Sequence, residues 1–362
     1  MTASTTPARS RTARGFHPLT VARVDRLCAD AVAVTLTVPS ELAETYRFRA
    51  GQSLTLRRTV DGREERRSYS VCAAEGEQLR IGVREVPGGV FSTWLVREVQ
   101  PGDTIDVGAP AGTFTPARHA GRHVLIGAGS GITPLLSIAS TVLSDPDATV
   151  TLLYGNRRSD TVMFTDELAD LKDHRPQRLE LVHVLSREPR EADLLSGRLD
   201  TDKLRALLAL VPDPDAVDDW WLCGPYDMVV GAGALLREAG VPAERIHREL
   251  FFVDDAPPEP VRHADPATPA DACEVTLVLD GRRTTTTVAK DVPVLDGAQR
   301  VRPDLPFACK GGVCGTCRAR VTEGEVAMRR NFALEDAEVA AGFVLTCQAL
   351  PVSDSVAVDY DD

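Results

Sequence analysis

Residues 308–317 read ACKGGVCGTC, which places three cysteines and three glycines within ten positions of a chain that has only eight cysteines. With the lone cysteine of VLTCQAL, about thirty positions later, the spacing is C-x4-C-x2-C and then a distant C. This spacing matches plant-type [2Fe–2S] sites, in which four thiolates hold two irons and the fourth comes from elsewhere in the fold. The predicted iron ligands are Cys309, Cys314, Cys317 and Cys347.

The glycines of this cysteine loop fit the same interpretation. Gly311, Gly312 and Gly315 permit positive φ angles and let backbone N–H groups come close to the sulfurs. Zinc is the alternative occupant, but zinc ribbons usually pair two short C-x2–4-C knuckles, whereas this sequence has one. The pattern therefore favours the cluster over zinc.

The composition sets the class of protein. A chain of 362 residues with 43% hydrophobic and 26% charged residues is an ordinary globular mixture, too long for one core. No apolar run would serve as a signal peptide or span a bilayer, so we expect a cytoplasmic protein without membrane contact. In a reducing compartment, clustered cysteines indicate metal or redox chemistry. The net charge of −12 argues against non-specific nucleic-acid binding.

The sequence pattern divides the chain into domains. After a flexible N-terminus, residues 1–15, short alternating segments over 16–117 predict an antiparallel β-barrel. From 118 to 253, apolar strand-like runs alternate with helical stretches, which is typical of a parallel sheet covered on both faces. Residues 254–271 are rich in proline and alanine and predict an extended linker. The last unit, 272–362, holds a predicted hairpin, a short helix and the cysteine loop.

Two segments of the barrel indicate a dinucleotide flavin. RSYS, residues 67–70, puts Arg67 and Tyr69 on one strand face, although an ordinary exposed strand reads the same way. PGGVFSTWL then places two glycines at the start of a predicted helix, where free N–H groups and the helix dipole attract a pyrophosphate. The predicted flavin contacts are Arg67, Ser68, Tyr69, Ser70, Gly88, Gly89, Val90 and Ser92.

The α/β domain opens on LIGAGSGITPLLS, a strand, glycine loop and helix. It departs from G-x-G-x-x-G because Ile132 takes the place of the last glycine, so a purely structural turn remains open. The second strand ends in YGNRR, with no acidic residue for a ribose hydroxyl, and the third ends in SRE. Arg157 with Ser186 and Arg187 therefore favours a 2′-phosphate, and hence NADPH, although each arginine also fits a solvated strand end.

Two further segments lie at predicted strand ends. LCGPYDM places Cys223 and Gly224 at the carboxyl edge of the sheet, where open α/β folds bind ligands. HRELFF offers Glu249 and Phe251, and its two aromatic rings also fit a plain core position.

In this order, RSYS, GGVFSTWL, GAGSGITP, YGNRR and CGPYDM resemble the ferredoxin–NADP reductase superfamily. The segments ACKGGVCGTCRARV and VLTCQALP resemble its oxygenase-reductase branch, which carries a C-terminal ferredoxin. The resemblance spans about residues 16–360. It implies an FAD-binding antiparallel β-barrel, an NAD(P)-binding α/β domain and a β-grasp ferredoxin domain. The stretch from Cys309 to Pro351 is also similar to the reductase subunits of phenylacetyl-CoA epoxidases.

The resemblance also implies roles for individual residues. Arg67 would meet the flavin pyrophosphate, Tyr69 would lie on the isoalloxazine, and Ser70 would approach its N5. Thr133 and Cys223 would flank the nicotinamide. Glu249 is a candidate proton relay, and Ser70, Cys223 and Glu249 are the candidate catalytic residues. The implied nucleotide contacts are Gly129, Gly131, Thr133, Arg157, Ser186, Arg187, Cys223, Gly224 and Phe251.

The function expected from the sequence is an electron conduit. Electrons would pass from NADPH through FAD and the [2Fe–2S] cluster to a di-iron oxygenase, with phenylacetyl-CoA epoxidase as the expected partner in a transient complex. Alternatives are the reductase of another oxygenase or hydroxylase, a redox sensor without turnover, and an enzyme that reduces a small substrate directly. The sensor would need a basic DNA-binding helix, which the sequence lacks. An appended ferredoxin argues against direct reduction.

Charge near the cysteine loop suggests how such a partner would be recognised. The segment from Val301 to Arg320 carries four basic residues against Asp304 alone, which predicts a basic rim around the cluster that steers an acidic partner. The basic residues are Arg302, Lys310, Arg318 and Arg320. A solvated loop is the alternative interpretation.

Overall fold

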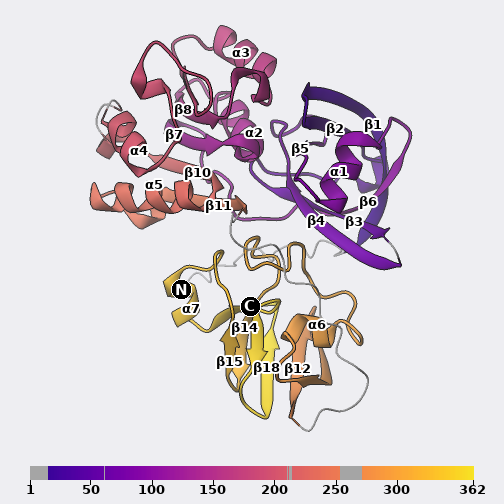
Figure 1. Ribbon diagram of the computed structural model, residues 1–362. Helices are drawn as coiled ribbons and strands as arrows, with labels where there is room; N and C mark the ends of the chain where they lie inside the picture. The colour runs from indigo at the N-terminus through magenta and orange to yellow at the C-terminus, as the bar shows by residue number, and fades with distance from the viewer. Residues whose placement is uncertain (1–14, 61, 210, 212–213, 253–270) are drawn as a thin grey trace, which may run out of the picture.

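The computed structural model describes residues 15–60, 62–209, 211, 214–252 and 271–362, which form three domains (Figure 1). We refer to them as the barrel, the parallel-sheet domain and the C-terminal domain. The expected linker, apart from residue 271, and the expected flexible N-terminus, apart from residue 15, lie outside the described residues. No helix in the described part of the chain is both long and apolar enough to cross a bilayer.

The barrel is an antiparallel sheet with the order β4-β3-β6-β1-β2-β5. Its strands are β1 (Phe16–Cys28), β2 (Ala31–Thr37), β3 (Ser53–Val60), β4 (Arg63–Ser70), β5 (Arg80–Arg84) and β6 (Thr104–Gly108). An antiparallel bridge from Val71 to Ile81 joins the two edge strands and closes the sheet, as the alternating sequence predicts. Helix α1 (Val90–Arg97) connects β5 to β6.

The second domain is a parallel sheet with the order β11-β10-β7-β8-β9. The strands are β7 (Gly121–Ala128), β8 (Ala148–Asn156), β9 (Leu179–Leu185), β10 (Asp219–Pro225) and β11 (Ile246–Phe252). The helices are α2 (Ile132–Val142), α3 (Thr165–His174), α4 (Thr201–Leu208) and α5 (Tyr226–Glu238). The carboxyl ends of β7, β8, β10 and β11 carry most of the motifs identified in the sequence, so the fold gathers them at one edge.

The C-terminal domain is a β-grasp fold with the mixed sheet β13-β12-β18-β14-β16, in which β12 and β18 are parallel. Its elements are β12 (Ala272–Leu279), β13 (Arg282–Ala289), α6 (Val294–Ala298), β14 (Arg318–Glu323), β15 (Val326–Met328), α7 (Asp336–Ala340), β16 (Phe343–Leu345), β17 (Ala349–Pro351) and β18 (Ser355–Asp359). The cysteine loop runs between α6 and β14, on the side facing the other two domains (Figure 1).

The apolar cores show how the domains are joined. One buried cluster contains Ala31 and Ala33 of the barrel together with Ile132 and Leu135 of α2 and Trp221 of β10. The barrel and the parallel-sheet domain therefore share part of their core. The C-terminal domain has a separate core, built around its own sheet and α6.

Candidate functional site

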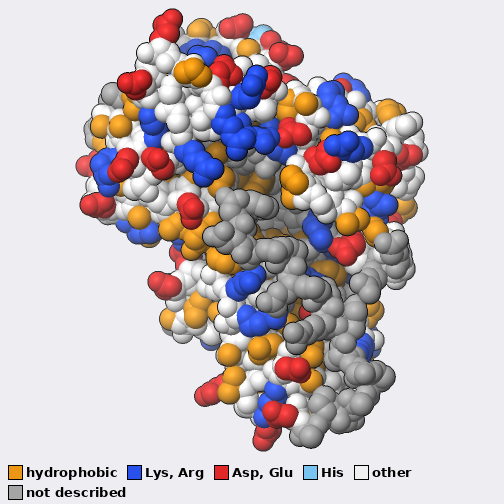
Figure 2. Space-filling view, in the orientation of Figure 1, with side chains coloured by type: hydrophobic (Ala, Val, Ile, Leu, Met, Phe, Trp, Pro, Cys, Tyr) orange, Lys and Arg blue, Asp and Glu red, His pale blue; other side chains and the backbone are white. Residues whose placement is uncertain are grey.

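A cavity of about 2630 Å³ lies where the three domains meet. It is larger than the 300–1,000 Å³ typical of a site for one small molecule, and so has room for more than one dinucleotide. Figure 2 shows Lys and Arg side chains gathered over the junction of the barrel and the parallel-sheet domain. The predicted site residues that line the cavity are Arg67, Ser68, Tyr69, Ser70, Gly88, Gly89, Val90, Ser92, Gly129, Arg157, Ser186, Gly224, Glu249, Phe251, Cys309 and Cys314.

The barrel wall of the cavity combines β4 with the start of α1. Tyr69 packs 6.1 Å from Phe91, centroid to centroid, and burial raises the pKa of its hydroxyl. Helix α1 begins after Gly89, and no side chain caps its first N–H groups. A Cβ on Gly89 would lie 2.7 Å from the Ser92 hydroxyl, so the backbone there has no room for a side chain. Uncapped donors beside an open cavity suit the pyrophosphate of a dinucleotide.

The glycine loop after β7 is packed tightly against the end of β10. A Cβ on Gly131 would lie 2.2 Å from the carbonyl oxygen of Cys223, which requires glycine at this position. Thr133, the next site residue in the chain, is buried, and its hydroxyl donates to the carbonyl of Ser130 at 3.0 Å. Gly129 and Gly224 line the cavity, whereas Gly131, Thr133 and Cys223 are not among its lining residues.

The three candidate catalytic residues come together from two domains. The Ser70 hydroxyl, at the end of β4, donates to Oε2 of Glu249 at 3.4 Å. Glu249 on β11 pairs in register with Cys223 on β10. Burial raises the pKa of Glu249 to about 8, although the Ser70 hydrogen bond opposes the shift. Burial likewise raises the pKa of Cys223, and the neighbouring Glu249 adds to this effect. Glu249 is therefore mostly protonated at neutral pH.

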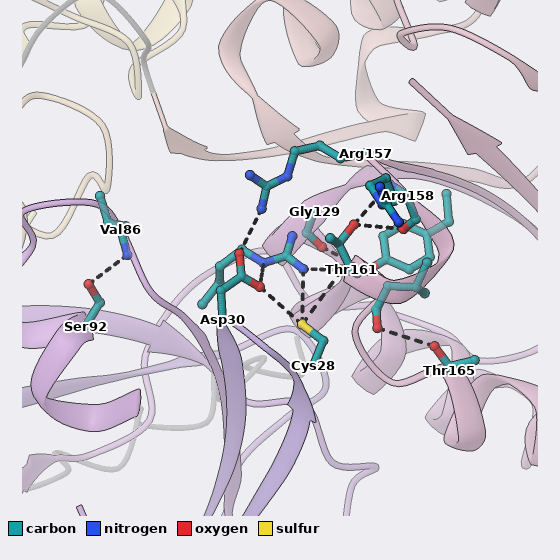
Figure 3. Close-up of polar contacts among 12 residues, drawn as sticks. Cys28, Asp30, Val86, Ser92, Gly129, Arg157, Arg158, Thr161 and Thr165 are labelled. Atoms are coloured by element: carbon teal, nitrogen blue, oxygen red, sulfur yellow. Dashed lines mark hydrogen bonds and ion pairs between the residues drawn. The ribbon is translucent and has the colours of Figure 1, made fainter. Parts of the chain in front are cut away.

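Arg157 reaches across to the barrel (Figure 3). Its Nη2 lies 2.8 Å from Oδ2 of Asp30, and Nε of Arg84 lies 3.3 Å from the other carboxylate oxygen. Burial raises the pKa of Asp30, but Arg84, the thiol of Cys28 and Arg157 together hold it below its usual value. This polar cluster links the β1–β2 turn to the end of β8, at the rim of the cavity.

The other predicted phosphate-binding residues are placed differently. Ser186 lines the cavity, whereas Arg187 is exposed and is not among the lining residues. Arg198, which the sequence analysis did not select, does line it. Asn156 was also missed: it is buried at the end of β8, lines the cavity, and no hydrogen bond to its amide group is found among the described residues. A buried, unpartnered amide facing a cavity is suited to a polar ligand.

The four predicted iron ligands form two pairs of thiols. Cys314 donates to Cys309, and this bond, with the backbone N–H groups of Gly311 and Val313, lowers the pKa of Cys309 to about 5 against the effect of burial. Cys317 donates in the same way to Cys347, which lowers the pKa of that thiol. No three His, Cys, Asp or Glu side chains in the described residues converge on a single ion. Two separate pairs of sulfurs fit a cluster of two irons, each held by two thiolates.

The glycine loop around these thiols fits the expectation only in part, because Gly311 is not among the residues with a positive φ angle and the non-glycine Lys310 is, at +51°. Gly312 and Gly315 have φ angles of +79° and +66°. The backbone N–H of Gly311 donates to the Cys309 sulfur at 3.3 Å. Such N–H···S bonds tune the charge on cluster thiolates.

The predicted basic rim is wrong, because each of its cations has an acidic partner. Arg302 is only 3% exposed and pairs with Asp304, with an Nε to Oδ1 distance of 2.9 Å. The other pairs are Lys310 with Asp296, Arg318 with Glu338 and Arg320 with Asp362. Three of these four carboxylates lie outside the segment that suggested the rim, and the charge that was to steer a partner is balanced locally.

Comparison with known proteins assigns each domain. The model of an oxidoreductase FAD-binding domain matches residues 18–115, and that of an oxidoreductase NAD-binding domain matches 125–233. A 2Fe-2S iron-sulfur cluster binding domain matches 277–352. The chain is 44% identical to one of the subunits of the 1,2-phenylacetyl-CoA epoxidase of Escherichia coli K12, over 96% of this chain and 98% of that protein. The chain belongs to the oxygenase reductases.

Another relative of this reductase is the ferredoxin reductase component of the 3-ketosteroid-9-alpha-monooxygenase of Rhodococcus rhodochrous. The two are 33% identical over 94% of this chain and 96% of the relative. Phthalate dioxygenase reductase has the same fold, with a TM-score of 0.62 and 23% identity, over 95% of this chain and 98% of that one. The expected three-domain architecture is thereby confirmed.

The oxygenase reductase is thus an NAD(P)H-dependent oxidoreductase that carries FAD and a [2Fe–2S] cluster and supplies electrons to an oxygenase. Its cavity accommodates this set of groups, since the barrel, the sheet edge and the cysteine loop all open into it. From here the barrel is called the flavin domain, the parallel-sheet domain the nucleotide domain, and the C-terminal domain the cluster domain.

Proposed function

We propose that this reductase supplies electrons to a di-iron oxygenase that epoxidises phenylacetyl-CoA, as a cytoplasmic protein in a transient complex. The main support for this proposal is the 44% identity to a subunit of the 1,2-phenylacetyl-CoA epoxidase of Escherichia coli over nearly the full length of both chains. The reductase components of steroid and glycine betaine monooxygenases match at 33% and 29% identity. The second candidate function is that this protein is the reductase of a different oxygenase.

The proposed roles of the site residues follow from their positions. Bound FAD would supply the hydride-accepting chemistry, and a bound [2Fe–2S] cluster would supply one-electron transfer. Tyr69 and the start of α1 hold the flavin at the barrel wall, while Gly129 and Gly224 leave room for the nucleotide. Ser70, at the end of β4, and Glu249, in the middle of β11, form a hydrogen-bonded pair. With a pKa of about 8, Glu249 holds a proton at neutral pH and is placed to deliver or take one beside the flavin position.

We further propose that NADPH is the preferred coenzyme. Arg157 and Arg198 both line the cavity next to Ser186, and guanidinium groups bind phosphate with charge-assisted hydrogen bonds. A 2′-phosphate would compete with Asp30 for Arg157, because Nη2 of Arg157 already lies 2.8 Å from Oδ2 of Asp30. Asp30 therefore limits how strongly Arg157 favours NADPH, and Asp30→Asn is expected to increase the preference.

The proposed domain boundaries are 16–117, 118–253 and 272–362, with 254–271 as a tether. Three observations support them: the closed barrel, the parallel sheet that begins at Gly121, and the separate core of the cluster domain. A chain ending at residue 253 is expected to bind FAD and reduce ferricyanide with NADPH. Failure of this fragment to fold would contradict the proposed boundary.

The acceptor is tested by coupled turnover. The purified reductase is mixed with NADPH and the oxygenase subunits of a phenylacetyl-CoA epoxidase, and epoxide formation is compared with NADPH consumption. The control replaces these subunits with the oxygenase of a 3-ketosteroid 9α-hydroxylating system. We expect tight coupling with the first and little with the second. Coupling to the steroid oxygenase alone would contradict the proposed acceptor and support the second candidate.

A further inference from the structure

Arg66 is a buried cation between the flavin domain and the cluster domain. It lies on β4 and is 5% exposed. Its Nη1 donates to the carbonyl oxygen of Leu305 at 3.3 Å, and its Nη2 donates to that of Pro303 at 3.1 Å. Its guanidinium also lies 4.2 Å from the ring centroid of Phe307. Arg66 thus contacts three residues of the cluster domain in one short loop.

That loop leads directly into the iron site. Phe307 is two residues before Cys309, and Nζ of Lys310 lies 4.7 Å from the same ring. On the flavin side, Arg66 is followed by the segment from Arg67 to Ser70, which lines the cavity. One strand therefore carries both the proposed flavin contacts and the residue that holds the segment just before the cysteine loop.

The charge of Arg66 is compensated within its own strand. Its Nε donates to Oε1 of Glu64 at 2.8 Å, and Nη2 lies 2.6 Å from the same oxygen. Burial lowers the pKa of Arg66 and Glu64 opposes that shift, but an arginine stays protonated in proteins. The guanidinium is held by Glu64 in an orientation that leaves two N–H groups directed at the cluster domain.

The nucleotide domain adds a second point of contact. Arg248 pairs with Glu335 at 2.5 Å, and the ring of Tyr226 meets that of Phe332 edge-on at 5.2 Å. Arg248 and Glu335 are both partly exposed, so this pair contributes little by itself. Arg66 is almost completely buried, so its contact is screened less by solvent than the pair of Arg248 with Glu335.

We propose that Arg66 is a positioning residue that docks the cluster domain with its cysteine loop turned toward the flavin cavity. Docking through this residue controls the transfer of electrons from flavin to cluster and leaves the acceptance of hydride unaffected. The inference does not depend on which oxygenase is the acceptor. Release of the same contacts frees the cysteine-loop face of the cluster domain for an external acceptor.

The test uses the full-length holoprotein with Arg66→Ala, Arg66→Lys and the control Arg57→Ala. Arg57 also pairs with Glu64 and lies 4.3 Å from the Phe16 ring, and its recorded contacts stay within the flavin domain. Hydrogen–deuterium exchange of residues 302–307, without coenzyme, reports docking through the exposure of this segment to water, although Pro303 and Pro306 have no exchangeable amide. Stopped-flow measurement separates flavin reduction by NADPH from the later reduction of the cluster.

For Arg66→Ala we expect faster exchange in residues 302–307 and slower cluster reduction, each by about tenfold or more, since hydrogen bonds from a charged donor are lost. Flavin content and the rate of flavin reduction should stay within about twofold of the unmodified protein, as they should for Arg57→Ala. Arg66→Lys should recover only part of the loss, because an ammonium lacks the fork that reaches both carbonyls.

Three results would overturn the proposal. The first is unchanged exchange and cluster reduction in Arg66→Ala. The second is an equal effect from Arg57→Ala, which would mean that the strand, and not the docking contact, is perturbed. The third is an Arg66→Lys variant whose exchange and cluster reduction equal those of the unmodified protein, which would mean that only the positive charge matters and not the two hydrogen bonds to the carbonyls. If Arg66→Ala binds no FAD, Arg66→Lys, which keeps the charge and most of the volume, decides between these outcomes.

Discussion

Replacing Glu249 with Gln should stabilise the reductase, and increasingly so as the pH rises. Glu249 has a pKa of about 8 in the folded protein because it is buried at the meeting of β10 and β11. In the unfolded chain its pKa returns to about 4.3. An acid whose pKa is raised by folding contributes no penalty below pH 4.3. Between about pH 4.3 and about pH 8 this acid lowers the free energy of unfolding further as the pH rises, because it loses its proton more easily in the unfolded chain than in the folded protein.

The size of the effect follows from this window. At pH 7 the unfolded carboxyl is about 2.7 pH units above its pKa, while the folded one is still mostly protonated. At about 1.4 kcal/mol per unit, the unscreened penalty is about 3–4 kcal/mol. Glu249 is only half-buried where it faces the cavity, so solvent screening reduces this to about 1–3 kcal/mol. Gln keeps a polar side chain at the site and cannot ionise in either the folded or the unfolded state.

The assay is denaturant unfolding of FAD-saturated protein between pH 4 and pH 8.5. Glu238→Gln, an exposed position at the end of α5, serves as the control. The difference between Glu249→Gln and the unmodified protein should be near zero at pH 4 and largest near pH 8. The reasoning is refuted by a difference that does not change with pH, or by a variant that is less stable at pH 8. If Glu249 relays a proton, the turnover rate of the unmodified protein should change near pH 8 as Glu249 ionises, and this change should be absent from the variant.

Three other predictions concern the cofactor sites. Cys314→Ser should lose the cluster, measured as iron and acid-labile sulfide, yet keep FAD and NADPH-dependent ferricyanide reduction; loss of FAD as well would contradict independent domains. Replacing Arg157 or Arg198 with Ala should raise KM for NADPH about threefold to tenfold while KM for NADH changes little, because each guanidinium is partly exposed. Equal changes for both coenzymes would remove the phosphate-binding role. Gly131→Ala should cost about 1–3 kcal/mol in unfolding free energy, because its Cβ would overlap the Cys223 carbonyl; an unchanged midpoint would show that the loop can yield.

The sequence predicts the architecture well because its signals are local. Strand alternation and helical periodicity act over a few residues, and the barrel and the parallel sheet both appear where they were expected. The hydrogen bond between Ser70 and Glu249 was not predicted, although the sequence analysis selected both residues as candidates. Nothing in the local pattern says that residues 179 positions apart share a hydrogen bond.

Charge partners show the limit of reading the sequence alone. The basic rim was inferred from a count of charges within twenty positions, whereas its carboxylates include Asp296, Glu338 and Asp362 from outside that segment. Arg66 carries no motif, and its two carbonyl acceptors lie 237 and 239 positions away. Such pairs depend on how separate domains pack, which periodicity does not encode.

The core shared by the flavin and nucleotide domains has a mechanical consequence. Separating those two domains would expose buried side chains such as Ile132, Leu135 and Trp221, at about 25 cal/mol for each Å² of apolar surface. Between described residues, the cluster domain is held to them by the polar contacts of Arg66, by the pair Arg248–Glu335 and by the rings of Tyr226 and Phe332. Among the described residues, a buried apolar cluster spans the interface between the flavin and nucleotide domains, and none spans the interface with the cluster domain. If docking through Arg66 controls the electron step, as proposed, the flavin and nucleotide domains move as one body, and the interface that opens to pass electrons outward is the one with the cluster domain.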